Sequence, residues 1–204
     1  MFRADPPSGP ATDPETGDPL YAYKPSLAAA PCQFRLRPDA LEWRTGRRSG
    51  LIAYDRARRV RLSFRPVNLA AARFVAEVWD ADGARIVIAS TSWKSIAEQE
   101  PLDAAYRAFI TELHRRILAA GGTAAFEAGS PVWLYWPGVA VFAATALVLA
   151  ALTVVALASG QISGALFVAG FLALFLWRLG GYFARNRPGI YRPDALPAAL
   201  IPRA

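Results

Sequence analysis

The sequence predicts an α+β domain followed by a two-helix transmembrane hairpin. Short runs in which apolar and polar residues alternate fill residues 31–100, which is typical of strands with one buried face. A single apolar stripe at helical spacing follows over residues 102–117. Between Glu127 and Arg178 the chain contains no Asp, Glu, Lys, Arg or His. These three patterns define a sheet, an amphipathic helix and a long apolar region.

The apolar region divides into two segments of membrane-spanning length. Residues 132–158 and 165–183 are each near the roughly 20 residues that a membrane helix needs, and residues 159–164 form a short polar connection. Because backbone amides in hydrocarbon must be paired internally, we expect two helices in a hairpin over residues 132–183. The alternative, a hairpin buried in a soluble protein, would require two consecutive helices that are apolar on all sides.

The flanks of the hairpin predict its orientation. Aromatic residues open the first segment and close the second, as expected at a membrane interface; they are Trp133, Tyr135, Trp136, Trp177, Tyr182 and Phe183. Arginines precede the first segment and follow the second, whereas the connection carries no charge. The positive-inside tendency therefore predicts a multi-pass protein of a bacterial inner membrane with both termini in the cytoplasm, residues 184–204 forming a basic cytoplasmic tail.

The first 30 residues differ in composition from the rest. They contain many prolines and acidic residues and no apolar core of a signal peptide. Low hydrophobicity with frequent proline predicts a disordered tail over residues 1–30. The hairpin would then direct membrane insertion.

Residues 31–121 are expected to form one small cytoplasmic domain. The clearest strand has Val60, Leu62 and Phe64 on one face and arginines on the other, and Pro66 should end it. The runs 73–79 and 85–89 are expected to pair across a glycine-containing loop, with 92–94 as a last short strand. The helix should start near Pro101, which suits a first helical turn, and residues 122–131 should be a linker.

Part of this domain resembles a known family. The matching residues are Leu36, Pro38, Asp39, Ala40, Leu41, Trp43, Gly46, Arg47, Arg48, Gly50, Ile52, Tyr54, Val60, Arg61 and Leu62. This stretch resembles the opening of bacterial membrane-anchored pleckstrin-homology-like (PH-like) domains. The resemblance covers roughly residues 34–121 and implies a PH-like fold of six to seven antiparallel strands capped by one C-terminal helix. Members of that family more often place their membrane helices before the domain.

Arginine is concentrated in the predicted strands. Residues 32–66 hold ten arginines and three carboxylates, an excess equal to the net charge of +7 for the entire chain. Arginine side chains suit phosphate recognition, and anionic membrane surfaces attract basic groups. The candidate binding residues for an anionic phospholipid or another membrane protein are Arg47, Arg48, Arg58, Arg59 and Arg61. The alternative is a solvated sheet face, and nucleic acid is not an expected partner because no recognition motif accompanies the charge.

Other reactive side chains give no catalytic pattern. His114 is the only histidine, lacks partners at metal-ligand spacing, and is expected at a surface or interface. Cys32, the only cysteine, excludes an intrachain disulfide and is expected to be a small apolar filler. We therefore expect a non-enzymatic, membrane-anchored interaction module without cofactor or metal. The alternative is a structural or accessory subunit of a larger membrane complex with no ligand of its own.

Overall fold

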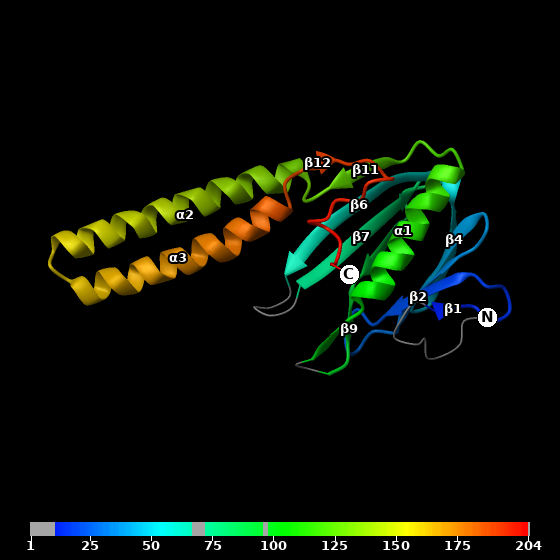
Figure 1. Ribbon diagram of the computed structural model, residues 1–204, viewed down its shortest axis with the longest axis horizontal. Coiled ribbons are helices and arrows are strands. Elements are labelled where there is room, and N and C mark those ends of the chain that lie inside the picture. The colour runs from blue at the N-terminus through cyan, green and yellow to red at the C-terminus, as the bar shows by residue number, and fades with distance from the viewer. Residues whose placement is uncertain (1–10, 67–71, 96–97, 204) are drawn as a thin grey trace. The chain divides into compact units, whose positions relative to one another are not determined.

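The computed structural model describes residues 11–66, 72–95 and 98–203, and the chain divides into two compact units. The first, which we call the sheet unit, comprises the described residues up to Ala128 together with residues 189–203. The second, the hairpin unit, is the segment from Gly129 to Pro188. The predicted α+β class, with antiparallel sheets, an amphipathic helix and a helical hairpin, is confirmed (Figure 1).

The first sheet of the sheet unit is an antiparallel meander in chain order. Its strands are β1 (Ala11–Thr12), β2 (Pro19–Tyr23), β3 (Cys32–Leu36), β4 (Ala40–Thr45) and β5 (Arg48–Ala53). Gly50 lies directly opposite Trp43, and a Cβ on Gly50 would meet the indole ring at 3.0 Å. Glycine at this position therefore leaves room for the Trp43 ring to lie against the strand.

The structure corrects the predicted disordered tail for the described residues from 11 to 30. β2 pairs with β3, and Tyr21 and Tyr23 are buried. Their hydroxyl groups donate to the carbonyl oxygens of Ala89 and Val87, and so connect the two sheets. The frequent prolines favour disorder in a local reading of the sequence. The strand forms nevertheless, because it is stabilised by tertiary contacts with residues more than 60 positions away. Residues 1–10 lie outside the described part of the chain.

The second sheet has the order β12-β11-β6-β7-β8. Its strands are β6 (Ala57–Pro66), β7 (Ala72–Asp80), β8 (Arg85–Ala89), β11 (Ala125–Ala128) and β12 (Gly189–Ile190). All neighbours are antiparallel except β11, which runs parallel to β6. A 3₁₀ turn, η1 (Tyr54–Arg56), leads from β5 into β6, and a separate pair is formed by β9 (Thr91–Trp93) and β10 (Gln99–Pro101). The predicted strands over 73–79 and 85–89 lie in β7 and β8, and β6 ends at Pro66 as predicted.

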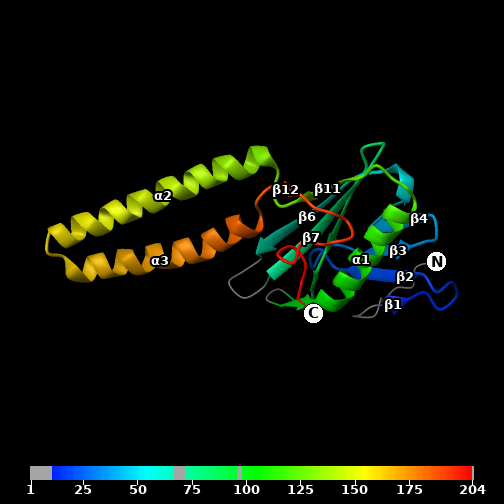
Figure 2. The same ribbon diagram turned by 45° about the horizontal axis from the view of Figure 1, so that its top comes forward.

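Helix α1 (Asp103–Ala119) supplies the centre of the core. Its apolar stripe, which includes Tyr106, Phe109 and Leu113, is buried, as the spacing predicted. Figure 2 shows the helix lying beside β2. The Phe109 ring contacts Tyr21 on β2 and Phe34 on β3 at centroid distances of 5.4 and 6.4 Å. Pro101 was expected in the first helical turn, but it lies in β10, where it pairs opposite Thr91.

The predicted linker and C-terminal tail are both corrected by the structure. Residues 125–128 form β11 instead of an irregular linker, because β11 pairs with β6. The chain after the hairpin returns to the sheet unit: β12 pairs with β11, and Tyr191 donates its backbone N–H to Phe126 O at 3.1 Å. Leu200 and Ile201 are only 2% and 5% exposed. Residues 189–203 are thus part of the folded sheet unit.

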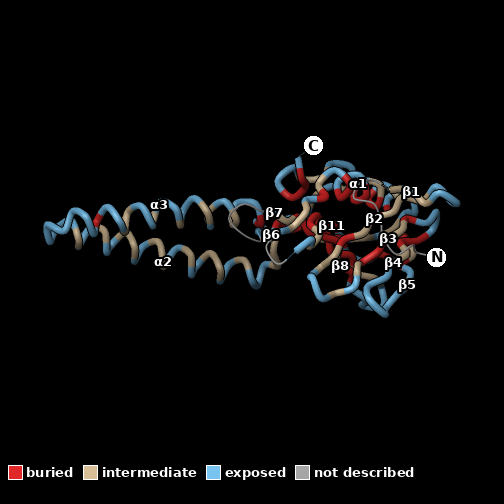
Figure 3. The backbone as a smooth tube through the Cα atoms, turned by 90° about the horizontal axis from the view of Figure 1, so that it is seen from below, coloured by how far each residue is buried: buried red, intermediate tan, exposed pale blue. Residues whose placement is uncertain are grey.

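The hairpin unit consists of two antiparallel helices, α2 (Val132–Ala158) and α3 (Ile162–Arg185). Both are long and apolar enough to cross a membrane. No residue of α2 is buried, and Ala165 is the one buried residue of α3. Figure 3 shows mostly intermediate and exposed residues along both helices. Gly129 has a φ of +77°, and Ser130 donates its N–H to Asn186 O at 3.0 Å. This hydrogen bond holds the two ends of the hairpin together.

Candidate functional site

The five arginines proposed from the sequence lie in two places. Arg47 and Arg48 lie at the turn between β4 and β5, whereas Arg58, Arg59 and Arg61 lie on β6. Arg47, Arg48 and Arg58 are exposed, and no ion pair joins them to a carboxylate within the described ranges. The two remaining arginines belong to an ordered group on the second sheet.

Arg59 and Arg61 share one carboxylate and one indole ring. Glu127 on β11 lies 3.3 Å from the Nε of Arg59 and accepts a hydrogen bond of 3.0 Å from the Nε of Arg61. The two guanidinium carbons lie 5.3 and 5.2 Å from the centroid of the Trp79 ring, within the range of cation–π attraction. Arg59 lies directly opposite Trp79 because β6 pairs antiparallel with β7. The register of three strands therefore assembles this group.

A second carboxylate on the same sheet face holds two more arginines. The Glu77 side chain is only 3% exposed, and it accepts a hydrogen bond of 2.9 Å from Arg65 and another from Arg85. Arg85 lies directly opposite Trp79 from the β8 side, with its guanidinium 5.6 Å from the ring centroid. We call this set the arginine–tryptophan cluster. Its members are Arg59, Arg61, Arg65, Arg85, Trp79, Glu77 and Glu127.

The arginine–tryptophan cluster retains positive charge after its internal pairing. Four guanidinium groups share two carboxylates, which leaves two unbalanced positive charges. The side chains of Arg59, Arg65 and Arg85 are about half exposed, at 45%, 54% and 48%. Each guanidinium has more N–H groups than its bonds to a carboxylate use, so donors remain for an external anion. The cluster can therefore bind an anion without a change of fold.

The sequence predicts only part of this cluster. Arg59 and Arg61 are among the candidate binding residues named from the sequence, whereas Trp79, Arg65, Arg85 and both carboxylates are not. Alternation along the runs 73–79 and 85–89 places Glu77, Trp79 and Arg85 on polar sheet faces. Only the pairing order of β11, β6, β7 and β8 shows that these faces are the same one.

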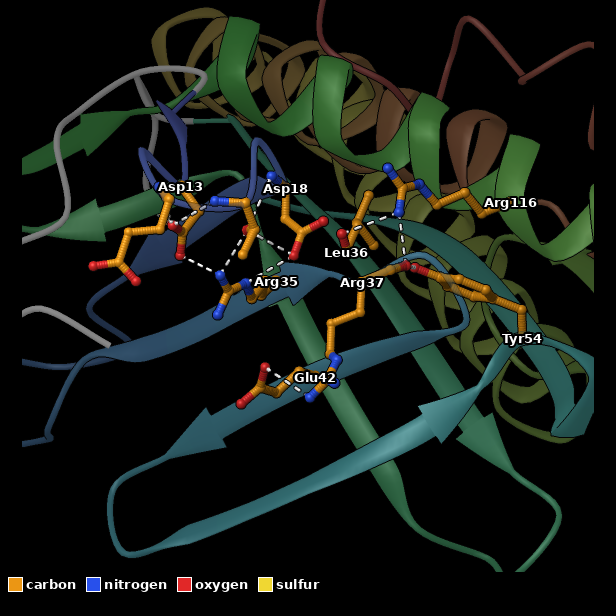
Figure 4. Close-up of polar contacts among 10 residues, drawn as sticks. Asp13, Asp18, Arg35, Leu36, Arg37, Glu42, Tyr54 and Arg116 are labelled. Carbon is orange, nitrogen blue, oxygen red and sulfur yellow. Dashed lines mark hydrogen bonds and ion pairs between the residues drawn. The ribbon is translucent and has the colours of Figure 1, made fainter. Parts of the chain in front are cut away.

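A separate polar pocket of about 710 Å³ lies between α1, η1 and the first sheet. Its lining combines three acidic and two basic residues with small apolar ones; they are Asp18, Pro38, Asp39, Ala53, Tyr54, Asp55, Arg115, Arg116, Ala119 and Ala120. Figure 4 shows Arg116 and Tyr54 pointing toward the Leu36–Arg37 backbone. Arg116 donates to both carbonyl oxygens at 3.0 and 2.6 Å, and the Tyr54 hydroxyl donates to Arg37 O at 2.8 Å.

Three of the five charged residues that line this pocket, Asp18, Arg115 and Arg116, make contacts within the fold. Hydrogen bonds from Arg115 and from Arg116, on the same helix, lower the pKa of Glu112 to about 2. On the neighbouring strands, Arg35 on β3 pairs with Asp18 at 3.0 Å and with Asp13 (Figure 4). These contacts fix the β1–β2 turn against β3, and Arg116 fixes α1 against the first sheet. Asp18, Arg115 and Arg116 therefore have a structural role that does not require a ligand.

His114 is buried, which corrects its expected place at a surface or interface. It is 1% exposed, and its Nδ1 lies 2.7 Å from Ile110 O, which can only accept a hydrogen bond. Nε2, at 2.7 Å from the Tyr191 hydroxyl, is then the acceptor from that hydroxyl. Burial lowers the pKa of His114 to about 4, so the ring is neutral at pH 7. The returning C-terminal segment, which the sequence did not predict, is what buries it.

The remaining candidate for reactive chemistry is Cys32. It is a buried free cysteine on β3, and burial raises the pKa of its thiol. A neutral buried thiol fits the predicted role of a small apolar side chain. Within the described residues, no group of three or more His, Cys, Asp or Glu side chains could hold a metal ion.

Comparison with known proteins gives no relative for this chain. No family model, no curated protein and no solved structure matches it.

Proposed function

We propose that the chain is a bacterial inner-membrane protein anchored by α2 and α3, with the sheet unit acting as a non-enzymatic interaction module. The observation that supports this most directly is the apolar, exposed surface of both helices. Val141, Leu147, Phe167 and Trp177 are 68–77% exposed, which would be costly in water. Lipid is the solvent that removes this cost. The flanking arginines and aromatic residues support an orientation with both termini in the cytoplasm.

The proposal includes a PH-like fold for the sheet unit. Two sheets joined by η1, with one helix packed in the core, support this assignment. β1, β2, β10, β11 and β12 would then be additions to the seven strands β3 to β9, which agrees with the six to seven that the resemblance implies. Fold alone does not define function, so the proposed role rests on the arginines.

The module would bind anionic lipid headgroups, or an acidic surface of a membrane protein, through its arginine-rich surface. The exposure of Arg47, Arg48 and Arg58 supports this role, as does the unbalanced charge of the arginine–tryptophan cluster. Each basic group near an anionic surface contributes roughly 1 kcal/mol at low ionic strength.

The test uses the full chain, because a fragment limited to residues 31–121 would lack β2, β11 and the returning C-terminal segment. The chain should stay in the membrane pellet after alkaline carbonate extraction. In detergent, native mass spectrometry should show preferential retention of phosphatidylglycerol over phosphatidylcholine. The triple variant R47Q/R48Q/R58Q should reduce that preference, because it removes three positive charges. It breaks no ion pair among the described residues. Equal retention of the two lipids would refute headgroup binding and favour the structural-subunit alternative.

A further inference from the structure

We infer that the arginine–tryptophan cluster is a binding site for a phosphomonoester dianion, presented by a lipid headgroup or by a free phosphate ester. This inference rests on the proposed role of the arginine-rich surface and specifies its ligand. The site lies entirely on the second sheet and involves β6, β7, β8 and β11.

The unbalanced charge of the cluster favours a dianion as the ligand. The cluster has four guanidinium groups against Glu77 and Glu127, so two positive charges remain. A phosphomonoester carries about −1.5 to −2 charges at pH 7, whereas a phosphodiester carries one. A dianion would therefore balance the cluster, and a phosphodiester would leave it positive. Arg73, directly opposite Arg65 on β7, lies outside the cluster and adds a third positive charge at one end of the same face, which further favours a dianion over a monoanion.

The four guanidinium groups of the cluster are held in place before any ligand binds. Glu77 is a nearly buried carboxylate, and it holds Arg65 and Arg85 from two different strands. Glu127 holds Arg59 and Arg61 in the same way, and the Trp79 ring lies within 5.6 Å of three of the four guanidinium groups. Long side chains lose conformational entropy when they bind a ligand, and this cost is lower when carboxylates and a ring already restrain them. The cluster is therefore prepared for an anion, in contrast to the exposed turn with Arg47 and Arg48.

The decisive variant is R59Q/R85Q. It removes the two unbalanced charges and leaves each carboxylate one guanidinium partner, Arg61 for Glu127 and Arg65 for Glu77. No buried charge is left unpaired, so we expect the fold to persist, and an unchanged thermal unfolding curve would verify this. The matched control R192Q/R203Q removes the same charge from two exposed arginines of the returning C-terminal segment, outside the proposed binding surface.

The experiment compares lipid binding to the full chain in neutral detergent by native mass spectrometry. Phosphatidic acid carries a phosphomonoester headgroup, and phosphatidylglycerol carries a phosphodiester. The wild-type chain should prefer phosphatidic acid about tenfold, because its headgroup carries up to one more negative charge than that of phosphatidylglycerol. R59Q/R85Q should bring that ratio close to one, and R192Q/R203Q should preserve it. Competition by glycerol 3-phosphate would support a site that accepts the free ester, whereas binding without competition would support the lipid as the source.

Three results would overturn the inference. These are equal binding of the two lipids by the wild-type chain, a preserved ratio in R59Q/R85Q, and an equal loss in both variants. The proposed function fails separately, because it requires only that anionic lipid be retained over phosphatidylcholine. A chain that prefers phosphatidylglycerol and phosphatidic acid equally over phosphatidylcholine would refute the phosphomonoester site and leave the anionic-surface role intact.

Discussion

The buried His114 should make the sheet unit lose stability below neutral pH. Its ring is neutral in the folded state, where burial lowers the pKa to about 4, whereas an unfolded histidine has a pKa of about 6.5. The unfolded state therefore binds a proton first as the pH falls. Stability from this group is fully present above pH 6.5 and is lost progressively between pH 6.5 and pH 4.

The size of the effect follows from the two pKa values. At pH 5 the unfolded histidine is mostly protonated and the folded one is mostly neutral, which costs about 2 kcal/mol relative to pH 7.5. Nε2 faces the Tyr191 hydroxyl, and the rings of Phe126 and Tyr191 pack against the imidazole at 5.3 and 5.8 Å. A proton gained there must be accommodated among aromatic rings, which is why the charged form is disfavoured.

The assay is urea unfolding of the full chain in neutral detergent at pH 7.5 and pH 5. Pulsed hydrogen exchange read on peptides from β6 and β7 reports the sheet unit without the hairpin. Between the two pH values the wild-type chain should lose about 2 kcal/mol more than H114Q. Y191F keeps the imidazole, so it should retain the pH dependence of the wild-type chain. The same pH dependence in H114Q and in the wild-type chain would refute the assigned role of His114.

Two further predictions concern the returning C-terminal segment and the base of the hairpin. L200A should destabilise the sheet unit by about 3 kcal/mol, because Leu200 is 2% exposed, whereas L51A, at a side chain that is 55% exposed, should cost under about 0.5 kcal/mol in the same urea assay. G129A should open the base of the hairpin, because the residue has a φ of +77° and a Cβ would lie 2.3 Å from Asn186 O. Hydrogen exchange at Ser130 should then rise, with G189A as a control at a glycine that has open space; unchanged exchange in G129A would contradict the close approach.

Local patterns were sufficient to predict several elements of the fold. The β6 strand follows from alternation between Val60 and Phe64 and from the inability of Pro66 to extend a ladder. The α1 stripe follows from helical spacing, and the hairpin from two uncharged segments of sufficient length. Each of these signals arises within one element, so the order of residues alone contains it.

The regions predicted incorrectly depend on contacts between distant residues. A disordered tail is predicted where β2 lies because its tyrosines gain their partners on β8, more than 60 residues later. A basic cytoplasmic tail is predicted after the hairpin because β11, the partner of β12, precedes the whole hairpin in the sequence. His114 was placed at a surface for the same reason, since Tyr191 follows it by 77 residues.

The candidate site also combines features that the sequence predicts with features that depend on contacts between distant residues. The sequence by itself determined that the chain has an excess of arginine in residues 32–66 and that Arg59 and Arg61 share one strand face. Only the tertiary structure decided that Arg65, Arg85 and Trp79 join them around Glu77 and Glu127. The physical reason is strand register: charges become a site when hydrogen-bonded pairing places them opposite one another, and that pairing depends on the whole sheet.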